Sequence, residues 1–130
     1  MIRVVAGVVM DAGRVMIARR QARLRMGGLW EFPGGKVEEG ESDQDALIRE
    51  LKEELNLVVK VHEFLGESTH DDGRGPLLLV AYRCSIVSGE MTLHDHDAVR
   101  FVSPEDFGSY TFAPADIPLL DAVSERASCT

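Results

Sequence analysis

The order of apolar and polar residues predicts β-strands on both sides of one helix. Residues 3–10 and 14–19 are dominated by apolar side chains, and Asp11-Ala12-Gly13 between them predicts the turn of a β-hairpin. Later strands are expected at 58–65, 77–87 and 98–102. This alternation of strands with a helical segment is consistent with an α/β protein.

The helical segment has two functionally different faces. At about 100° per residue, one apolar stripe that would pack on a core contains Leu47, Ile48, Leu51 and Leu55. Ser42 is a good N-cap, and Asp45 three residues later gives an approximate capping box. Glu50, Glu53 and Glu54 lie on the adjacent arc, where their carboxylates can converge and repel one another. A hard divalent cation with oxygen ligands is the simplest way to offset that repulsion.

Several polar segments have ordinary structural explanations. Residues 70–76 are rich in turn formers and charge, which predicts a hairpin loop rather than a metal site. Residues 94–97 read His-Asp-His-Asp, which alone would indicate a solvated loop. Ser103 followed by Pro104 predicts the start of a helix, and Asp116 before an apolar run suits a helix N-cap.

Charge is distributed unevenly along the chain. The formal net charge is −8, but residues 1–34 carry six Arg against two acids, a balance of +4. Residues 35–57 carry eight acids against three bases, a balance of −5. An acidic patch that binds a cation beside an arginine-rich segment can hold a polyphosphate. Extended nucleic acid is not an expected partner because no basic stripe with interleaved aromatics is visible. The side chains of Arg23 and Arg25 are expected to be solvated.

Size and cysteine content narrow the class of protein. A length of 130 residues and a mass of 14.3 kDa predict a single domain, 1–130. No apolar run approaches the ~18 residues that span a bilayer, and no signal-peptide pattern is visible, so no membrane association is expected. Cys84 and Cys129 have no metal-ligand spacing and are expected to be free thiols, as is typical of a cytoplasmic protein.

The segment 35–57, GKVEEGESDQDALIRELKEELNL, resembles the Nudix box, G-x5-E-x7-R-E-U-x-E-E-x-G-U with U apolar. Eight positions fit at fixed spacing: Gly35, Glu41, Arg49, Glu50, Leu51, Glu53, Glu54 and Leu57. Asn56 departs from the pattern, because it stands where the box has glycine. That glycine would close the helix in a left-handed conformation, and Asn is the next most tolerant residue there.

The resemblance extends over essentially the whole chain and implies the Nudix fold, an α/β/α sandwich with a mixed β-sheet and the box as loop-helix-loop. It implies a metal site made by Glu50, Glu53, Glu54, the carbonyl of Gly34 and an acid before the last strand, which is Asp95 with Asp97 as the alternative. It also implies that Glu50 activates water, and that Arg49 orients the acidic cluster through Glu41 or Glu53. Mg²⁺ is the expected cofactor, with Mn²⁺ as a substitute.

The resemblance also suggests substrate-binding residues. Arg20 aligns with a nucleotide-contacting arginine of MutT-like Nudix enzymes, and Phe32 or Trp30 would pack against a nucleobase, with a core position as the alternative. The segment Ala113-Pro114-Ala115-Asp116 resembles the CTP pyrophosphohydrolase branch. Asp116 would read the base, because a carboxylate accepts from the exocyclic amine of cytosine but cannot donate to guanine O6.

The expected activity is therefore hydrolysis of a nucleoside triphosphate to the monophosphate and pyrophosphate, with CTP, dCTP and 5-substituted dCTP as substrates. Two alternatives remain. One is a MutT-type hydrolase of 8-oxo-dGTP, and the other is a nucleotide-sensing module without turnover, although none of the box glutamates is missing. The expected partner is a small-molecule nucleotide, and the protein is expected to be either a monomer or a homodimer.

Overall fold

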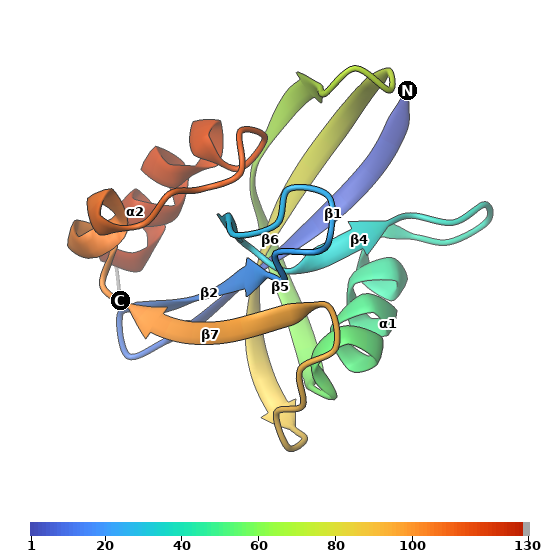
Figure 1. Cartoon of the computed structure of the whole chain (residues 1–130). Helices are drawn as coiled ribbons and strands as arrows, with labels where there is room; N and C mark the ends of the chain where they lie inside the picture. Colours follow the sequence, from blue (N-terminus) through green and yellow to red (C-terminus); the bar gives the residue numbers. More distant parts are fainter. Residues whose placement is uncertain (129–130) are drawn as a thin grey trace.

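A computed structural model describes residues 1–128 of the chain. It contains seven strands, two α-helices and two short 3₁₀ helices (Figure 1). The strands are β1 (Ile2–Asp11), β2 (Arg14–Arg20), β3 (Trp30–Glu31), β4 (Gly34–Lys36), β5 (Val58–Asp71), β6 (Pro76–Ser88) and β7 (His96–Val102). The helices are α1 (Asp43–Leu55), η1 (Pro104–Ser109), η2 (Ile117–Leu119) and α2 (Leu120–Ser128).

Strand β1 organises a mixed β-sheet. It pairs in parallel with β6 and antiparallel with β2 and β4, and the main strand order is β3-β2-β1-β6-β5. The predicted hairpin joins β1 to β2, with Asp11 paired to Arg14. Ala12 and Gly13 between them both have positive φ, 51° and 80°, as a two-residue type I′ turn requires. The hairpin prediction is therefore confirmed.

The two faces of the sheet build two hydrophobic cores. Because side chains alternate along a strand, Val5 and Val9 of β1 pack towards α1. Ala6 and Val8 pack on the opposite side, in the core that also contains α2 (Figure 1). Burial on both faces explains why β1 reads as a continuous apolar run. This arrangement confirms the predicted α/β/α sandwich.

Helix α1 differs from its predicted apolar stripe at one position. Leu47, Leu51 and Leu55 are fully buried as expected, but Ile48 is 40% exposed. Ala46, on the other side of the stripe, is buried instead. At about 100° per residue, this rotates the buried arc towards Glu50 and Glu54. The prediction for Ile48 was wrong because acidic side chains, rather than a fourth large apolar one, occupy part of the inward face.

The hairpin of β5 and β6 extends further than its apolar pattern indicates. β5 continues from Val58 to Asp71, and the turn is confined to residues 72–75. Register shifts occur near Val59, between Val61 and Phe64, and before Gly66. Such irregularities interrupt the period of two, so the second half of β5 could not be recognised from alternation. The predicted strand end at residue 65 was therefore wrong. The predicted hairpin loop is confirmed, but it is shorter than the predicted range 70–76.

The C-terminal region begins with 3₁₀ turns rather than α-helix. Ser103 and Pro104 begin η1, as their order predicts, although the Ser103 side chain makes no capping hydrogen bond. Asp116 precedes η2, and its side chain also makes no capping hydrogen bond. The capping explanation of Asp116 is therefore wrong, and its carboxyl group has a different partner. Cys84 is a buried free thiol, whereas Cys129 lies outside the described residues.

Residues 1–128 contain no helix that is long and apolar enough to cross a membrane.

An ion pair between Arg3 of β1 and the partly buried Asp43 anchors the N-terminus of α1 to the sheet. Arg3 donates from Nε and Nη2 to both carboxylate oxygens of Asp43 at 2.7 Å, and the Tyr82 hydroxyl donates to Oδ2 at 2.6 Å. The Arg3 hydrogen bonds hold the pKa of Asp43 below its usual range. A depressed carboxyl pKa contributes stability that is present above the unfolded-state pKa and is lost as the pH falls through the folded-state pKa.

We expect Asp43→Asn to lower the free energy of unfolding by about 1 kcal/mol at pH 7, since Arg3 is half-exposed and solvent screens the pair. The difference from wild type should shrink below about pH 4. Urea titrations at pH 7 and pH 3.5 measure both values. A constant difference at the two pH values would show that the carboxylate charge does not matter.

Candidate active site

Two glycines bring the backbone against the acidic helix. Gly34 and Gly35 lie on β4, where they pair with Ala6 and Val5 of β1. A Cβ on Gly34 would overlap the Val5 carbonyl, and a Cβ on Gly35 would overlap the Glu50 carboxylate. Glycine at both positions therefore allows the strand to pass close to β1 and to Glu50.

Arg49 connects the loop of the Nudix box to its helix. The guanidinium donates to both oxygens of Glu41, at 2.8 and 2.9 Å, and to the Lys36 carbonyl at 3.0 Å. It also donates to Glu50 at 2.8 Å and more weakly to Glu53 at 3.4 Å. The side-chain hydrogen bond from Arg49 lowers the pKa of Glu41 to about 2. Arg49 was expected to contact Glu41 or Glu53, and it contacts both. It also forms a hydrogen bond with Glu50, which was not expected.

Glu54 has the most unfavourable electrostatic surroundings of the three box glutamates. Burial raises its pKa to about 8, and the charges of Glu50, Glu31 and Asp95 add to this, while Arg20 opposes it. One of its carboxylate oxygens, Oε2, is buried without a hydrogen-bond partner. An ionised group in this position lacks compensation from the protein, so a bound cation would stabilise it.

The donor set fits a hard divalent cation, although the side chains are not arranged as a complete ligand cage. Within residues 1–128, no three His, Cys, Asp or Glu side chains are close enough to hold a metal ion as they stand. Glu50 and Glu53 instead accept hydrogen bonds from Arg49. The unpartnered Glu54 oxygen and the surrounding carboxylates are nevertheless the oxygen ligands that Mg²⁺ prefers. The residues present thus fit a divalent cation. Binding of the cation through Glu50 and Glu53 would require their side chains to move away from Arg49.

The remaining predicted metal ligands differ in position. Asp95 is close enough to Glu54 to raise its pKa. Asp97, the alternative, instead forms an ion pair with Arg19 at 2.7 Å. Glu53 has a side chain that is 61% exposed. The charges of Glu50 and Asp95 therefore act on Glu54, whereas Glu53 lies at the solvent side of Arg49.

Asn56 closes α1 in the position where the box has glycine. It adopts φ 57° and ψ 35°, the left-handed conformation that the glycine would supply. Its side chain accepts from Lys52 at 2.9 Å and donates to the Glu90 carbonyl at 3.0 Å. These contacts offset the backbone cost of a side chain at positive φ.

We expect Asn56→Gly to change the free energy of unfolding by less than about 1 kcal/mol, because relief of backbone strain and loss of two exposed hydrogen bonds oppose each other. Catalysis should be unaffected. Denaturant unfolding and steady-state assays of both proteins test this. A larger destabilisation would mean that the Lys52 and Glu90 contacts, rather than the backbone conformation, end the helix.

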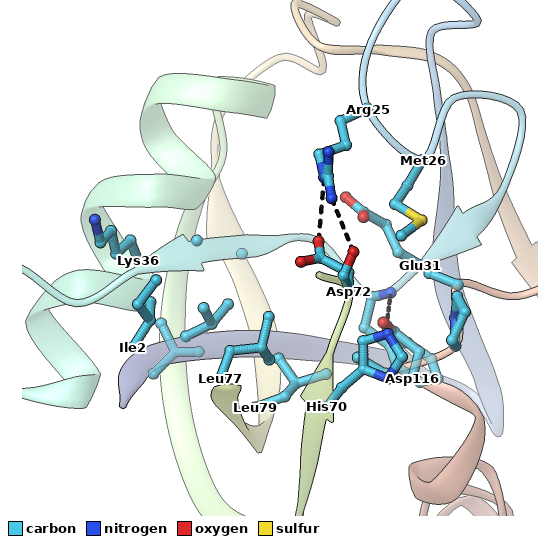
Figure 2. A pocket seen from close by; sticks show the side chains of 18 of the residues that line it. Ile2, Arg25, Met26, Glu31, Lys36, His70, Asp72, Leu77, Leu79 and Asp116 are labelled. Carbon is cyan, nitrogen blue, oxygen red and sulfur yellow. Dashed lines mark hydrogen bonds and ion pairs between the residues drawn. The ribbon is translucent and has the colours of Figure 1, made fainter. Parts of the chain in front are cut away.

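A cavity of about 550 Å³ is lined in part by the first residues of the box and by Glu31. Gly34, Gly35 and Lys36 of β4 line one part of it, and Asp116 and His70 line another (Figure 2). The apolar side chains Ile2, Leu77 and Leu79 form one wall. Arg20, a predicted substrate-binding residue, also lines the cavity. A molecule in this cavity can therefore reach from the box to Asp116.

Asp116 is deeply buried at its end of the cavity. Its Oδ2 accepts a hydrogen bond from the Phe32 backbone N–H at 2.9 Å (Figure 2). Burial raises the pKa of Asp116 to about 8, and the charge of Glu31 adds to this, while the Phe32 hydrogen bond opposes it. At pH 7 the carboxyl group is therefore mostly protonated and can donate as well as accept a hydrogen bond. The argument that Asp116 cannot donate to guanine O6 was wrong for this state.

The two aromatic candidates for base stacking belong to the core. The Phe32 ring is 3% exposed and packs against Phe107 and Phe112, with centroid distances of 6.3 and 5.8 Å. Trp30 is 9% exposed and packs edge-on against Tyr110. Little of either ring is free to stack on a base. Phe32 instead contributes its backbone N–H to the position of Asp116.

Glu31 and His96 were missed by sequence reasoning. Glu31 lines the cavity, and its charge acts on both Glu54 and Asp116. Its Oε2 accepts from Nε2 of His96 at 2.9 Å and lies 3.8 Å from Arg20. The His96 side chain is fully buried, and its Nδ1 has no hydrogen-bond partner. Glu31 could have been noticed in the sequence, because it is an acid within the apolar run 29–33. Its contact with His96 could not, because only the tertiary structure brings the two residues together.

Comparison with known proteins agrees with this fold. The family model described as NUDIX domain matches residues 1–123. The CTP pyrophosphohydrolase of Escherichia coli is 41% identical over 122 residues, which cover 94% of this chain and 90% of that protein. A putative 8-oxo-dGTP diphosphatase 2 of Mycobacterium tuberculosis is 38% identical over 115 residues, 87% of this chain and 81% of that protein. The solution structure of the E. coli ORF135 protein gives a TM-score of 0.84 at 40% identity and covers 98% of this chain and 92% of that one.

Proposed function

The chain belongs to the Nudix family and is a hydrolase, and from that premise we propose that it converts nucleoside triphosphates to the monophosphate and pyrophosphate. Nudix hydrolases act on small nucleotides and use divalent metal ions. Mg²⁺ is the proposed ion here, with Mn²⁺ as a substitute. The observation that carries the proposal is Glu54, a partly buried carboxylate with an unpartnered oxygen. The charge of Glu31, which lines the neighbouring cavity, acts on it.

In the proposed mechanism, Glu50, Glu54 and Asp95 would hold the ion with the Gly34 carbonyl, and Glu53 would join them from the exposed side. Bound Mg²⁺ would neutralise phosphate charge, orient the phosphate chain and lower the pKa of the attacking water. Breaking a phosphoanhydride needs positioning and charge stabilisation, so a Ser or Cys nucleophile is not required.

Two further box residues act on the water and on each other. Glu50 accepts the proton of the attacking water, because burial already raises its pKa and favours proton uptake. Arg49 donates to Glu50 at 2.8 Å and keeps its carboxylate towards the backbone of Gly35. Arg20 steadies the nucleotide from the other side of the cavity, beside Glu31.

CTP, dCTP and 5-substituted dCTP are the proposed substrates, with Asp116 as the residue that reads the base. The support is the 41% identity to the E. coli CTP pyrophosphohydrolase together with the position of Asp116 in the cavity. Hydrolysis of 8-oxo-dGTP is the second candidate. It is favoured by the protonated state of Asp116, which supplies a donor for guanine O6, and by the similarity to the M. tuberculosis protein.

Pyrophosphate release from a nucleotide panel with Mg²⁺ tests the proposal. The panel contains CTP, dCTP, 5-methyl-dCTP, dGTP, 8-oxo-dGTP and a nucleoside diphosphate sugar. We expect the highest kcat/KM for the cytosine nucleotides. Preference for 8-oxo-dGTP would reject the base assignment and retain the metal site. Tight nucleotide binding without turnover of any member would instead support a nucleotide-sensing module.

A further inference from the structure

We propose that Met26 is the residue that packs against the face of the nucleobase, in place of the buried aromatic rings, and that the Arg25–Asp72 ion pair holds it there. This inference rests on the proposed nucleotide substrate. Met26 is half-buried and lines the cavity from the segment 21–28, which lies between β2 and β3. In Figure 2 its side chain extends from that segment into the cavity near Glu31.

The segment 21–28 is a compact, internally bonded turn. Backbone hydrogen bonds run from Leu24 to Gln21, from Gly27 to Leu24 and from Gly28 to Arg20, at 2.9 to 3.0 Å. A Cβ on Gly27 would overlap the carbonyls of residues 21 and 22. The segment is therefore folded tightly on itself. This fixed backbone determines which of its side chains reaches the cavity.

Met26 occupies an uncommon backbone conformation within this turn. Its φ is 60°, in the left-handed region that a large unbranched side chain rarely adopts. Such conformations persist where the surrounding structure determines them, and they are concentrated at ligand-binding sites. Here the conformation directs a long apolar side chain into the cavity rather than into solvent.

An ion pair fixes the turn to the opposite side of the cavity. Arg25 donates from Nε to the Asp72 carboxylate and from Nη2 to the Asp72 carbonyl, both at 3.1 Å (Figure 2). Arg20 donates from Nε to the Arg25 carbonyl at 2.9 Å, so both ends of Arg25 are held. The Asp72 side chain is only 8% exposed. Arg25 is exposed, as expected from the sequence, but it is also ion-paired and is therefore placed to position Met26.

The opposite wall suits a flat apolar ligand surface. Ile2, Val4, Leu77 and Leu79 from β1 and β6 line the cavity together with Met26. Asp116 lies at one end, where it can bond the edge of a base. A nucleobase has apolar faces and a polar edge, and the polarisable sulfur of Met makes favourable contacts with aromatic rings. The cavity thus offers an apolar residue on each side of a base and a hydrogen-bonding group at its edge.

Met26→Asn tests the inference, because Asn tolerates the left-handed conformation but lacks the apolar surface. We expect KM for the preferred nucleotide of the panel to rise about tenfold, with kcat within about twofold of wild type. The Ki of inorganic tripolyphosphate, which has no base, should stay within about twofold. Met26→Leu should recover most of the affinity. Met91→Asn makes the same change at an exposed methionine outside the cavity and should leave KM unchanged.

An unchanged KM in Met26→Asn, or an equal loss of affinity for tripolyphosphate, would overturn the inference. The melting temperature of Met26→Asn should not fall, so unfolding is not an explanation for a raised KM. Turnover by the wild-type protein is judged first. An inactive wild type overturns the proposed function, whereas an active wild type with an unaffected Met26→Asn overturns only the role of Met26.

The positioning role of Arg25 has its own readout. If Arg25 acts through Met26, Arg25→Ala should raise KM, and adding Met26→Asn should raise it by less than about twofold more. Independent, multiplicative effects of the two substitutions on KM would show that Arg25 contacts the nucleotide directly or acts elsewhere. Arg23→Ala, an exposed neighbour in the same segment that does not line the cavity, is the matched charge control.

Discussion

Glu54→Gln should abolish metal-dependent pyrophosphate release, lowering kcat/KM by at least about a hundredfold, while the metal-free protein melts at a higher temperature. A neutral amide is a poor ligand for a hard cation, and even residues that only support metal ligands cost ten- to a hundredfold on substitution. In the proposed mechanism catalysis depends on the ion, whereas the metal-free fold has to hold the partly buried Glu54 carboxylate near the charges of Glu50, Glu31 and Asp95. Activity and stability should therefore change in opposite directions.

The stability change should depend on pH in a defined direction. The pKa of Glu54 in the folded protein is raised from 4.5 to about 8, so folding favours the protonated form. Above the unfolded-state pKa, stability falls as the pH rises towards 8, because the unfolded chain releases the proton more easily. Gln is neutral at every pH. The gain in melting temperature of the metal-free variant should consequently be larger at pH 8 than at pH 5.

Thermal melts in chelator at the two pH values, together with Mg²⁺-dependent assays, measure these effects. Glu39→Gln makes the same change at an exposed position in the loop of the box and should affect neither activity nor stability appreciably. Near-normal activity of Glu54→Gln would mean that Glu54 is not a metal ligand. A fall in its melting temperature would mean that the buried carboxylate is already compensated within the protein.

The parts of the fold that sequence predicts are those with a local physical signature. The 12–13 turn needs two positive φ values, and Ala-Gly between two apolar runs supplied a sufficient signal. The Ser42 hydroxyl caps α1 by accepting a hydrogen bond from the Asp45 N–H, and Asn56 ends α1 in the left-handed conformation. These features involve residues within four positions of each other, so they can be recognised without tertiary contacts.

The misses involve partners that are distant along the chain or properties that depend on burial. Arg25 is a surface charge as expected, but its ion pair was missed because its partner Asp72 is 47 residues away. Glu31 and His96 are separated by 65 residues and meet only after β3 and β7 both join β2. Asp116 was identified as a polar residue at the right place, but its protonation state depends on burial that no local pattern reveals.

That protonation state leads to the second large effect, which concerns Asp116→Asn. The pKa of the buried carboxyl group is raised from 3.8 to about 8. At pH 7 the unfolded chain has released this proton while the folded protein keeps it. The free energy of unfolding is therefore lower than at pH values where both states are protonated, by on the order of 4 kcal/mol. Asn removes this loss and can still accept from the Phe32 N–H. We expect the variant to be more stable than wild type by up to this amount at pH 7, and the difference to vanish near pH 4. Urea titrations across this range measure it.

The same substitution should separate the two base assignments. Above pH 8, wild-type Asp116 becomes a carboxylate that can only accept, which suits the cytosine amino group and disfavours guanine, whose O6 and N7 are acceptors. The ratio of kcat/KM for dCTP over dGTP should therefore increase several-fold from pH 7 to pH 9 in wild type. It should stay constant in Asp116→Asn, because the amide keeps both a donor and an acceptor. A constant ratio in wild type, or a preference between dCTP and 8-oxo-dGTP that the substitution leaves unaltered at pH 9, would show that Asp116 does not read the base.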